Sequence, residues 1–140
     1  MADKKIHLKI VSPNRIVLEK DVDMVIARSV EGDLGILPGH EQLTTLLGYG
    51  ALKYIIGNEE QELSVLGGFA EITAKSIIIL TDAAELPSEI DTQRAEEAKK
   101  RAQERIASSK SNTNLVRAEN SLHRALIRLD VADNKSKKFN

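Results

Sequence analysis

All eight glycines and all three prolines of this 140-residue chain lie at or before Pro87, and the 53 residues that follow contain neither. Glycine and proline supply the backbone angles that tight turns need. The first 87 residues also hold runs of Val, Ile and Leu, a composition typical of strands and turns. The last 53, rich in Ala, Glu, Lys and Arg, are typical of helix. The sequence therefore predicts an α+β chain with a β domain over residues 1–87 and a helical domain over residues 88–140.

The first 87 residues break into short runs in which polar and apolar residues alternate, as they do in a half-buried strand. Turn-forming pairs such as Gly57-Asn58 and Gly67-Gly68 separate the runs. Many short strands with regular turns predict an antiparallel β-sandwich or flattened barrel rather than a parallel α/β sheet. The predicted strands cover residues 7–12, 16–18, 21–27, 51–56, 63–66, 69–72 and 76–80. Residues 77–80 carry no charge, so we expect a central strand there that is covered on both faces.

Two amphipathic helices are expected after Pro87, because small and apolar residues recur there every three or four positions. The first series is Ala95, Ala98, Ala102 and Ile106, and the second is Leu115, Ala118, Leu122, Ala125, Leu129 and Ala132. The polar run over residues 108–114 predicts the loop of an antiparallel helical hairpin. An alanine buries little more than one methyl group, worth about 0.8 kcal/mol at best, so such a hairpin opens readily.

The sequence lacks the common catalytic and metal-binding motifs. It has no cysteine, which excludes disulfides, thiolate zinc sites and thiol redox chemistry. It has neither a phosphate-binding P-loop nor the nucleophile elbow of serine hydrolases. His40-Glu41 begins like a zinc-protease motif, but Thr44 stands where the second histidine belongs. We therefore expect no catalytic residue and no metal site.

Composition also bears on location and on nucleic-acid binding. No apolar run is long enough for a signal peptide or a membrane span, which predicts a soluble, cytoplasmic chain. Four residues are aromatic, namely Tyr49, Tyr54, Phe69 and Phe139. So few rings argue against a surface that stacks nucleic-acid bases.

Charge is divided unevenly between the two parts. Residues 1–87 hold 8 Lys and Arg against 13 Asp and Glu, a balance of −5, whereas residues 88–140 hold 12 against 8, a balance of +4. A basic tail on an acidic body indicates an anionic partner for the tail, such as a nucleotide, a nucleic acid, a lipid headgroup or an acidic protein surface. A solvated helix face is the simpler alternative, and charge alone leaves both open.

Arginines of the tail recur at helical spacing. Arg94 and Arg101 are seven residues apart, as are Arg117 and Arg124, so each pair projects from nearly one face of its helix. Arg128 follows Arg124 by four residues, where like charges repel by a few tenths of a kcal/mol. Such a cluster suits a polyanion, because guanidinium groups contact phosphate in a bidentate manner. Alternatively, intrahelical pairing makes it an ordinary surface, with partners at Glu97, Glu104 and Glu119.

The start of the first helix carries a capping pattern. Ser88 is followed three residues later by Asp91, which is the form of a capping box. The pattern predicts that the helix opens at Ser88 and that Asp91 satisfies its amino end. A role of Asp91 in recognition is a separate hypothesis.

Three features together resemble the epsilon subunit of bacterial F-type ATP synthase: Gly-Asp-Leu-Gly-Ile-Leu-Pro-Gly-His over residues 32–40, Gly-Gly-Phe over residues 67–69, and the two charged helices. The resemblance implies a β-sandwich followed by a helical hairpin, in a non-catalytic rotor subunit on the cytoplasmic face of the bacterial membrane. It implies that the sandwich binds the gamma subunit and the c-ring, with Asp33 and His40 in the loop that faces the c-ring. It also implies that the hairpin regulates ATP hydrolysis.

Residues 90–95, Ile-Asp-Thr-Gln-Arg-Ala, match the Ile/Leu-Asp-x-x-Arg-Ala motif of epsilon subunits that bind ATP. The implied ATP-binding residues are Glu85, Ile90, Asp91, Arg94, Ala95, Arg101, Arg124 and Arg128. The first three would surround adenine, Ala95 would leave room for the ligand, and the arginines would face the phosphates. His123 would make the charge near the phosphates depend on pH. The motif does not specify whether Mg²⁺ accompanies the nucleotide.

The resemblance implies a regulatory cycle. ATP would hold the hairpin folded against the sandwich, and without ATP the hairpin would extend and meet acidic segments of the catalytic beta subunits, which blocks hydrolysis. An alternative from another class is a β-sandwich adaptor whose basic hairpin binds an acidic protein or a nucleic acid. A hydrolase lacks any candidate group of catalytic residues.

Overall fold

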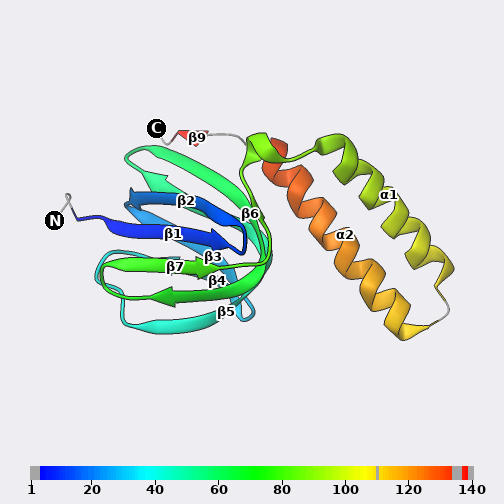
Figure 1. Cartoon of the computed structure of the whole chain (residues 1–140), viewed down its shortest axis with the longest axis horizontal. Helices are drawn as coiled ribbons and strands as arrows, with labels where there is room; N and C mark the ends of the chain where they lie inside the picture. The colour runs from blue at the N-terminus through cyan, green and yellow to red at the C-terminus, as the bar shows by residue number, and fades with distance from the viewer. Residues whose placement is uncertain (1–3, 110, 134–136, 139–140) are drawn as a thin grey trace.

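The computed structural model describes residues 4–109, 111–133 and 137–138, and in it a β-sandwich lies beside a helical hairpin (Figure 1). The strands are β1 (Ile6–Ser12), β2 (Arg15–Val22), β3 (Met24–Ser29), β4 (Gly32–Ile36), β5 (Leu43–Ile56), β6 (Glu59–Ile72), β7 (Ser76–Leu80), β8 (Ala84–Glu85) and β9 (Lys137–Lys138). A 3₁₀ turn, η1 (Pro87–Glu89), leads to the helices α1 (Thr92–Ser108) and α2 (Asn112–Asp133). None of the described helices is long and apolar enough to cross a membrane.

The strands follow the order β2-β1-β7-β6-β5-β3-β4, and β8 and β9 also pair with β6. The two 14-residue strands β5 and β6 pair along most of their length and curve, so that they serve both layers (Figure 1). The predicted sandwich is therefore confirmed. The sheet is mixed rather than purely antiparallel, however, because β1 and β7 run parallel.

The core between the layers is aliphatic. Alternate residues of β1 face it, and Ile6, Leu8 and Ile10 are completely buried. Ile77 and Ile79 of β7 are also completely buried, whereas Leu80 is 54% exposed. The expected central position of residues 77–80 is thus right, but the expected cover on both faces is wrong. β7 has neighbours on both sides and core on one face only.

The sequence suggested that the Gly67-Gly68 pair separates two strands, but it lies within one. β6 continues through it, and both glycines have positive φ angles, +82° and +114°. Opposite this point the pairing with β5 skips from Leu47 to Tyr49. A Cβ on Gly68 would lie 2.0 Å from the carbonyl oxygen of Leu80. Gly68 is therefore required by the close approach of the end of β7, not by a turn.

Other strand boundaries also differ from the prediction: β2, β5 and β6 are longer than expected, and β8 was not predicted. The expected run over residues 21–27 breaks at Asp23, whose carboxylate accepts a hydrogen bond from the Gly57 amide at 2.6 Å and pairs with Lys5 at 2.6 Å. β4 was not predicted, because two of its five residues are glycine. β4 is the edge strand of the sheet and β3 lies next to it. At this edge, pairing between strands overrides local propensity.

The predicted antiparallel hairpin is confirmed, with a shorter loop. α1 ends at Ser108 and α2 begins at Asn112, so the expected loop over residues 108–114 is wrong at its second half. The Ser111 hydroxyl accepts a hydrogen bond from the Asn114 amide at 3.3 Å. This cap lets α2 begin before the predicted end of the loop. The buried seam consists of Ala95, Ala102, Ala118 and Ala125. Val131, completely buried, was not part of the predicted series.

Candidate functional site

A cleft of about 420 Å³ opens where the chain passes from strand β8 into the hairpin. Strand β8, turn η1 and both helices contribute to it. The lining residues are Glu85, Glu89, Asp91, Arg94, Ala95, Ala98, Arg101 and Arg128. The structure thus brings together six of the eight residues that the sequence motif and its flanks nominated, although they come from β8, from α1 with its N-cap, and from α2.

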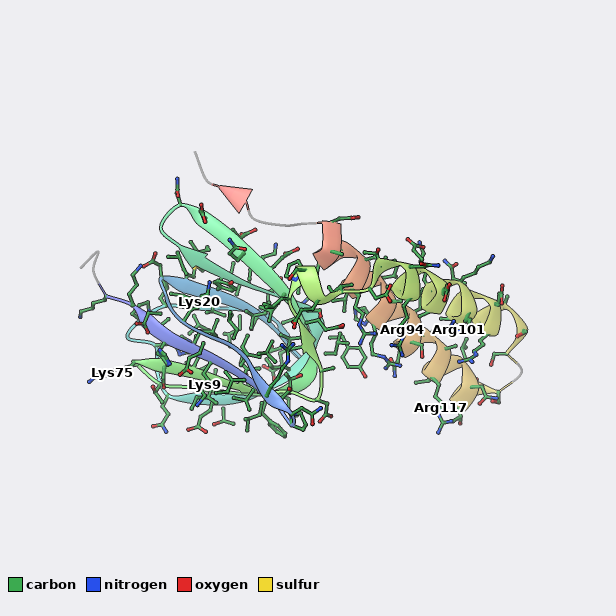
Figure 2. The ribbon with its side chains drawn as sticks, turned by 45° about the horizontal axis from the view of Figure 1, so that its top comes forward. Lys9, Lys20, Lys75, Arg94, Arg101 and Arg117 are labelled. Carbon is green, nitrogen blue, oxygen red and sulfur yellow. The ribbon has the colours of Figure 1, made fainter. Side chains whose placement is uncertain are left out.

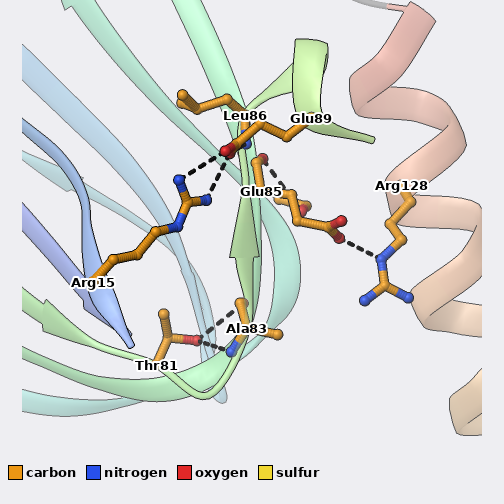
Figure 3. A network of polar contacts seen from close by, with 8 residues as sticks. Arg15, Thr81, Ala83, Glu85, Leu86, Glu89 and Arg128 are labelled. Atoms are coloured by element: carbon orange, nitrogen blue, oxygen red, sulfur yellow. Dashed lines mark hydrogen bonds and ion pairs between the residues drawn. The ribbon is translucent and has the colours of Figure 1, made fainter. Parts of the chain in front are cut away.

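Glu85 and Arg128 join the two parts of the chain across this cleft (Figure 3). Arg128 Nε, on α2, donates to Glu85 Oε1 at 2.5 Å. Glu85 is held in β8 by pairing with Ser64 of β6, whose hydroxyl donates to the Glu85 carbonyl at 3.4 Å. Both charged side chains are about one-third exposed, at 29% and 31%. A strand paired to the sandwich therefore presents one carboxylate to a helix that has to dock to reach it.

Glu89 is a lining residue that sequence reasoning did not identify. Its carboxylate accepts from the Leu86 amide at 2.9 Å and makes a two-pronged ion pair with Arg15 of β2, with both distances 2.7 Å (Figure 3). The hydrogen bond with Arg15 is the main cause that lowers the pKa of Glu89, and the Leu86 amide adds to it. The signal available in the sequence was an acid three residues after Leu86, which can fold back onto the start of a turn.

Asp91 is the N-cap of α1. Its Oδ1 accepts from the Arg94 amide at 3.1 Å, and the helix begins at Thr92. The expectation that the helix opens at Ser88 is wrong, because Pro87–Glu89 form a separate 3₁₀ turn and Ile90 is extended. A carboxylate has further lone pairs, and Asp91 Oδ2 has no hydrogen-bond partner among the described residues. Asp91 can therefore cap the helix and accept from a ligand at once.

The charges of the cleft are unequally paired. Glu85 is paired with Arg128, and Glu89 is paired with Arg15 from outside the cleft. Arg94 and Arg101 are exposed and form no ion pair with any residue that the structure describes. Two guanidinium groups on one face of α1 are therefore available to an anion.

Two nominated residues do not line the cleft. Ile90 is 8% exposed and lies between η1 and α1 as a packing residue. Arg124 docks α2 on the sandwich: Nη1 donates to the Tyr49 hydroxyl at 3.3 Å, and Cζ lies 5.6 Å from the centroid of the Tyr49 ring. The His123 ring lies 5.8 Å from the same ring. The sequence could not have shown this contact, because it joins residues 75 positions apart.

Asp33 and His40 do not share one loop, contrary to the expectation. Asp33 lies within β4 and accepts from Arg28 Nε of β3 at 2.6 Å. His40 follows β4, and its Nδ1 donates to the Glu41 carbonyl at 2.6 Å. Asp33 is therefore a strand residue, and of the two only His40 lies in the loop after β4. No group of three or more His, Asp or Glu that could hold a metal ion occurs in the part of the chain that the structure describes.

Comparison with known families places both parts of the chain. Residues 5–87 match the family described as the beta-sandwich domain of the ATP synthase Delta/Epsilon chain, and residues 88–133 match its long alpha-helix domain. The chain belongs to the ATP synthase delta/epsilon family. Curated relatives named ATP synthase epsilon chain agree along almost their whole length. One from Halalkalibacterium halodurans is 47% identical and covers 91% of this chain and 96% of its own, and one from Herpetosiphon aurantiacus is 45% identical over 91% and 93%.

Solved structures share the fold of this delta/epsilon family member. A chain in the cryo-EM structure of the Euglena gracilis mitochondrial ATP synthase, OSCP/F1/c-ring, matches with a TM-score of 0.79 at 24% identity, over 96% of this chain and 84% of that one. A chain in the Tetrahymena thermophila central stalk and c-ring structure matches with a TM-score of 0.65 at 14% identity, over 94% and 99%. The predicted family and the predicted fold are both confirmed.

Proposed function

We propose that this chain works as a non-catalytic rotor subunit of a proton-translocating ATP synthase, with its sandwich bound to the gamma subunit and the c-ring. Family membership supports the role, as do the neighbours whose structures are titled as F1/c-ring and central stalk assemblies. The subunit would sit on the cytoplasmic face of the bacterial membrane and be held there through the complex. Asp33 and His40 remain the candidate contacts with the c-ring.

An apolar row on the outer face of the sandwich supports the docking of gamma. Register places Leu46 opposite Phe69, Phe69 opposite Leu80, Leu80 beside Val11 and Val11 opposite Ile16, across five adjacent strands. Leu46, Phe69, Leu80 and Ile16 are each 50–54% exposed. A cavity of about 330 Å³ is lined by residues of β1, β6 and β7, among them Val11, Phe69 and Leu80 of the row. A contiguous apolar strip of this kind is typical of a protein interface, and its proposed occupant is gamma.

The regulatory ligand is proposed to be ATP, bound in the cleft at the base of the hairpin. The observation that carries the proposal is the cleft itself, in which Glu85 and Asp91 offer acceptors for an adenine amino group while Arg94 and Arg101 offer donors to phosphate. A nucleotide there would contact β8, α1 and α2 together. It would therefore bind the docked hairpin better than the undocked one, which stabilises the docked state by about 2.7 kcal/mol at a hundredfold excess over its dissociation constant.

Without ATP the hairpin would undock and extend along gamma, and its arginines and lysines would meet acidic segments of the beta subunits and inhibit hydrolysis. Its seam of four buried alanines favours such a rearrangement, because little apolar surface becomes exposed to water when the hairpin opens. The alternative, an adaptor whose basic hairpin binds an acidic protein or a nucleic acid, predicts no nucleotide binding and no association with ATP synthase. Family membership favours the rotor role.

The test is a nucleotide titration of the full chain with a distance readout. The native chain has no cysteine, so Ser111→Cys in the hairpin loop and Lys75→Cys before β7 can be labelled as a donor and acceptor pair. ATP is expected to narrow the distance distribution, and Arg94→Gln in the same background is expected to weaken this response. Lys99→Gln, on the same helix outside the cleft, is the charge-matched control. No response at high millimolar ATP would overturn the switch and leave the rotor role standing.

A further inference from the structure

A second cavity, of about 540 Å³, lies between the helices at the loop end of the hairpin. It is lined by Arg105, Ser108, Ser109, Asn114, Arg117, Ala118 and Ser121. No lining residue is shared with the cleft at the base of the hairpin. Figure 2 shows the separation along the hairpin, with Arg117 towards the loop and Arg94 towards the sandwich. The volume falls within the usual range for small-ligand sites.

The cavity differs from the basal cleft in charge. Three carboxylates line the basal cleft, and none lines this cavity. Arg105 of α1 and Arg117 of α2 face it from opposite helices, and neither forms an ion pair with a described residue. Two like charges that share one cavity repel each other, and an anion between them removes that cost.

Neutral hydrogen-bond donors complete the lining. The Ser121 hydroxyl oxygen accepts from Arg124 Nη2 at 3.0 Å, so its own O–H can donate elsewhere. The Asn114 side chain makes no hydrogen bond with a described residue, and its amide supplies two N–H groups. The Ser108 hydroxyl donates a hydrogen bond to the Glu104 carbonyl at 3.0 Å and therefore fixes the end of α1. Ala118, which also lines the cavity, is 2% exposed.

The helix dipoles do not account for this site. α1 ends and α2 begins beside the cavity, so a negative helix terminus and a positive one oppose each other there. The attraction for an anion comes from the two guanidinium groups, which can each form bidentate hydrogen bonds with a tetrahedral oxyanion.

We propose that this cavity is a second anion site of the hairpin, distinct from the nucleotide cleft, and that it binds a free inorganic phosphate oxyanion, with pyrophosphate preferred to orthophosphate. Pyrophosphate has enough oxygens to contact Arg105 and Arg117 at the same time and so ties α1 to α2 near their loop. The anion strengthens the pairing of the helices at the end farthest from the sandwich. It acts whether or not the basal cleft is occupied, so the site does not depend on the nucleotide proposal.

The test is calorimetric titration of the full chain with pyrophosphate and with orthophosphate, at constant ionic strength in chloride. Arg105→Gln with Arg117→Gln is expected to weaken pyrophosphate binding by about tenfold or more, because both charge-assisted contacts are lost. Lys99→Gln with Lys100→Gln removes the same total charge from positions outside both cavities. This pair is expected to leave the affinity for pyrophosphate within about twofold of wild type. Arg94→Gln with Arg101→Gln, in the basal cleft, is likewise expected to retain pyrophosphate binding.

Three results would overturn the proposal. The first is no heat at high millimolar pyrophosphate, and the second is equal weakening by the lysine pair, which means screening rather than a site. The third is loss of binding in Arg94→Gln with Arg101→Gln alone, which places the anion in the basal cleft. Amide chemical shifts of the wild-type chain provide a check that needs no variant. They are expected to move at residues 114–121, and movement confined to residues 91–98 contradicts the proposal.

Discussion

Arg128 of α2 reaches Glu85 of β8 at 2.5 Å, and this ion pair connects the hairpin to the sandwich at the edge of the candidate nucleotide cleft. Both side chains are about 30% exposed, so water screens the pair and its direct contribution to stability is small. Its position matters more than its strength. A ligand that contacts Glu85 has to share this carboxylate with Arg128 or displace Arg128 from it. Nucleotide binding and hairpin docking therefore act on the same two side chains.

Glu85→Gln and Arg128→Gln are each expected to lower the free energy of unfolding by about 1 kcal/mol or less. A double-mutant cycle, measured by urea unfolding, is expected to give a coupling energy of about 0.5 kcal/mol, because the pair is partly exposed. The same variants are expected to reduce the free energy of ATP binding by much more than this coupling energy. Equal ATP affinity in wild type and Glu85→Gln would remove Glu85 from the proposed site.

Tyr49 and Arg124 are expected to act as a docking contact. Tyr49→Phe removes the acceptor at 3.3 Å and keeps the ring beneath the guanidinium, whereas Tyr49→Ala removes both. We expect Tyr49→Ala to increase hairpin undocking several-fold more than Tyr49→Phe, as judged by the distance between labels on the hairpin and the sandwich. If Arg124 instead contacts phosphate, as the motif implied, Arg124→Gln will reduce ATP affinity while Tyr49→Ala leaves it unchanged.

Sequence reasoning succeeded where a residue's role depends on its neighbours along the chain. The helical tail follows from composition and the alanine seam from helical periodicity, and the structure contains both. Asp91, Arg94 and Arg101, which the resemblance grouped through a short local motif, line one cleft. Glu85 lies just before the hairpin, so proximity to the motif in sequence also meant proximity in space.

It failed where a role depends on a distant segment. Gly68 looked like part of a turn because its close neighbour, the Leu80 carbonyl, lies on another strand. Leu80 looked like a buried residue because nothing local shows that only one face of β7 meets the core. For Arg124, which the resemblance nominated for phosphate, the contact with Tyr49 could not be foreseen because Tyr49 belongs to the sandwich. The two errors at Gly68 and Leu80 and the unforeseen Arg124 contact have one cause, because periodicity along the chain does not show how distant segments meet.

Gly68→Ala is expected to be strongly destabilising. The new Cβ would lie 2.0 Å from the Leu80 carbonyl oxygen at a φ of +114°, so β6 and β7 would have to separate. We expect a loss of about 3 kcal/mol or more in the free energy of unfolding. Gly57→Ala is the matched control, because φ is +62° there and nothing lies within 4 Å of the added carbon. Its expected loss is about 1 kcal/mol, from the backbone angle alone. Similar losses for the two variants would contradict the assigned role of Gly68.

His7 is expected to give the sandwich a pH-dependent stability. Its Nδ1 and Nε2 lie 2.7 Å and 2.8 Å from the carboxylates of Asp21 and Glu19, and the hydrogen bond to Asp21, followed by that to Glu19, raises the pKa of His7 above 6.5. A raised folded-state pKa means that the stabilisation is fully present below 6.5 and is lost as pH rises through the higher folded-state value. Urea midpoints measured between pH 5.5 and 8.5 are expected to fall over that window. His7→Gln is expected to flatten this part of the profile, and an unchanged profile would exclude His7 as its source.

Substitutions at Asp91 can separate capping from recognition. Asp91→Ser keeps a side-chain oxygen for the Arg94 amide and removes the carboxylate, whereas Asp91→Ala removes both. Asp91→Ala is expected to lower the free energy of unfolding by about 1 kcal/mol, and Asp91→Ser by only a few tenths of that. Both are expected to weaken ATP binding, because the free Oδ2 is lost in each. Thermal unfolding with and without ATP measures the two effects on one sample. If Asp91→Ser binds ATP as wild type does, the cap is the sole role of Asp91, and the acceptor for the adenine amino group has to be Glu85 or the backbone.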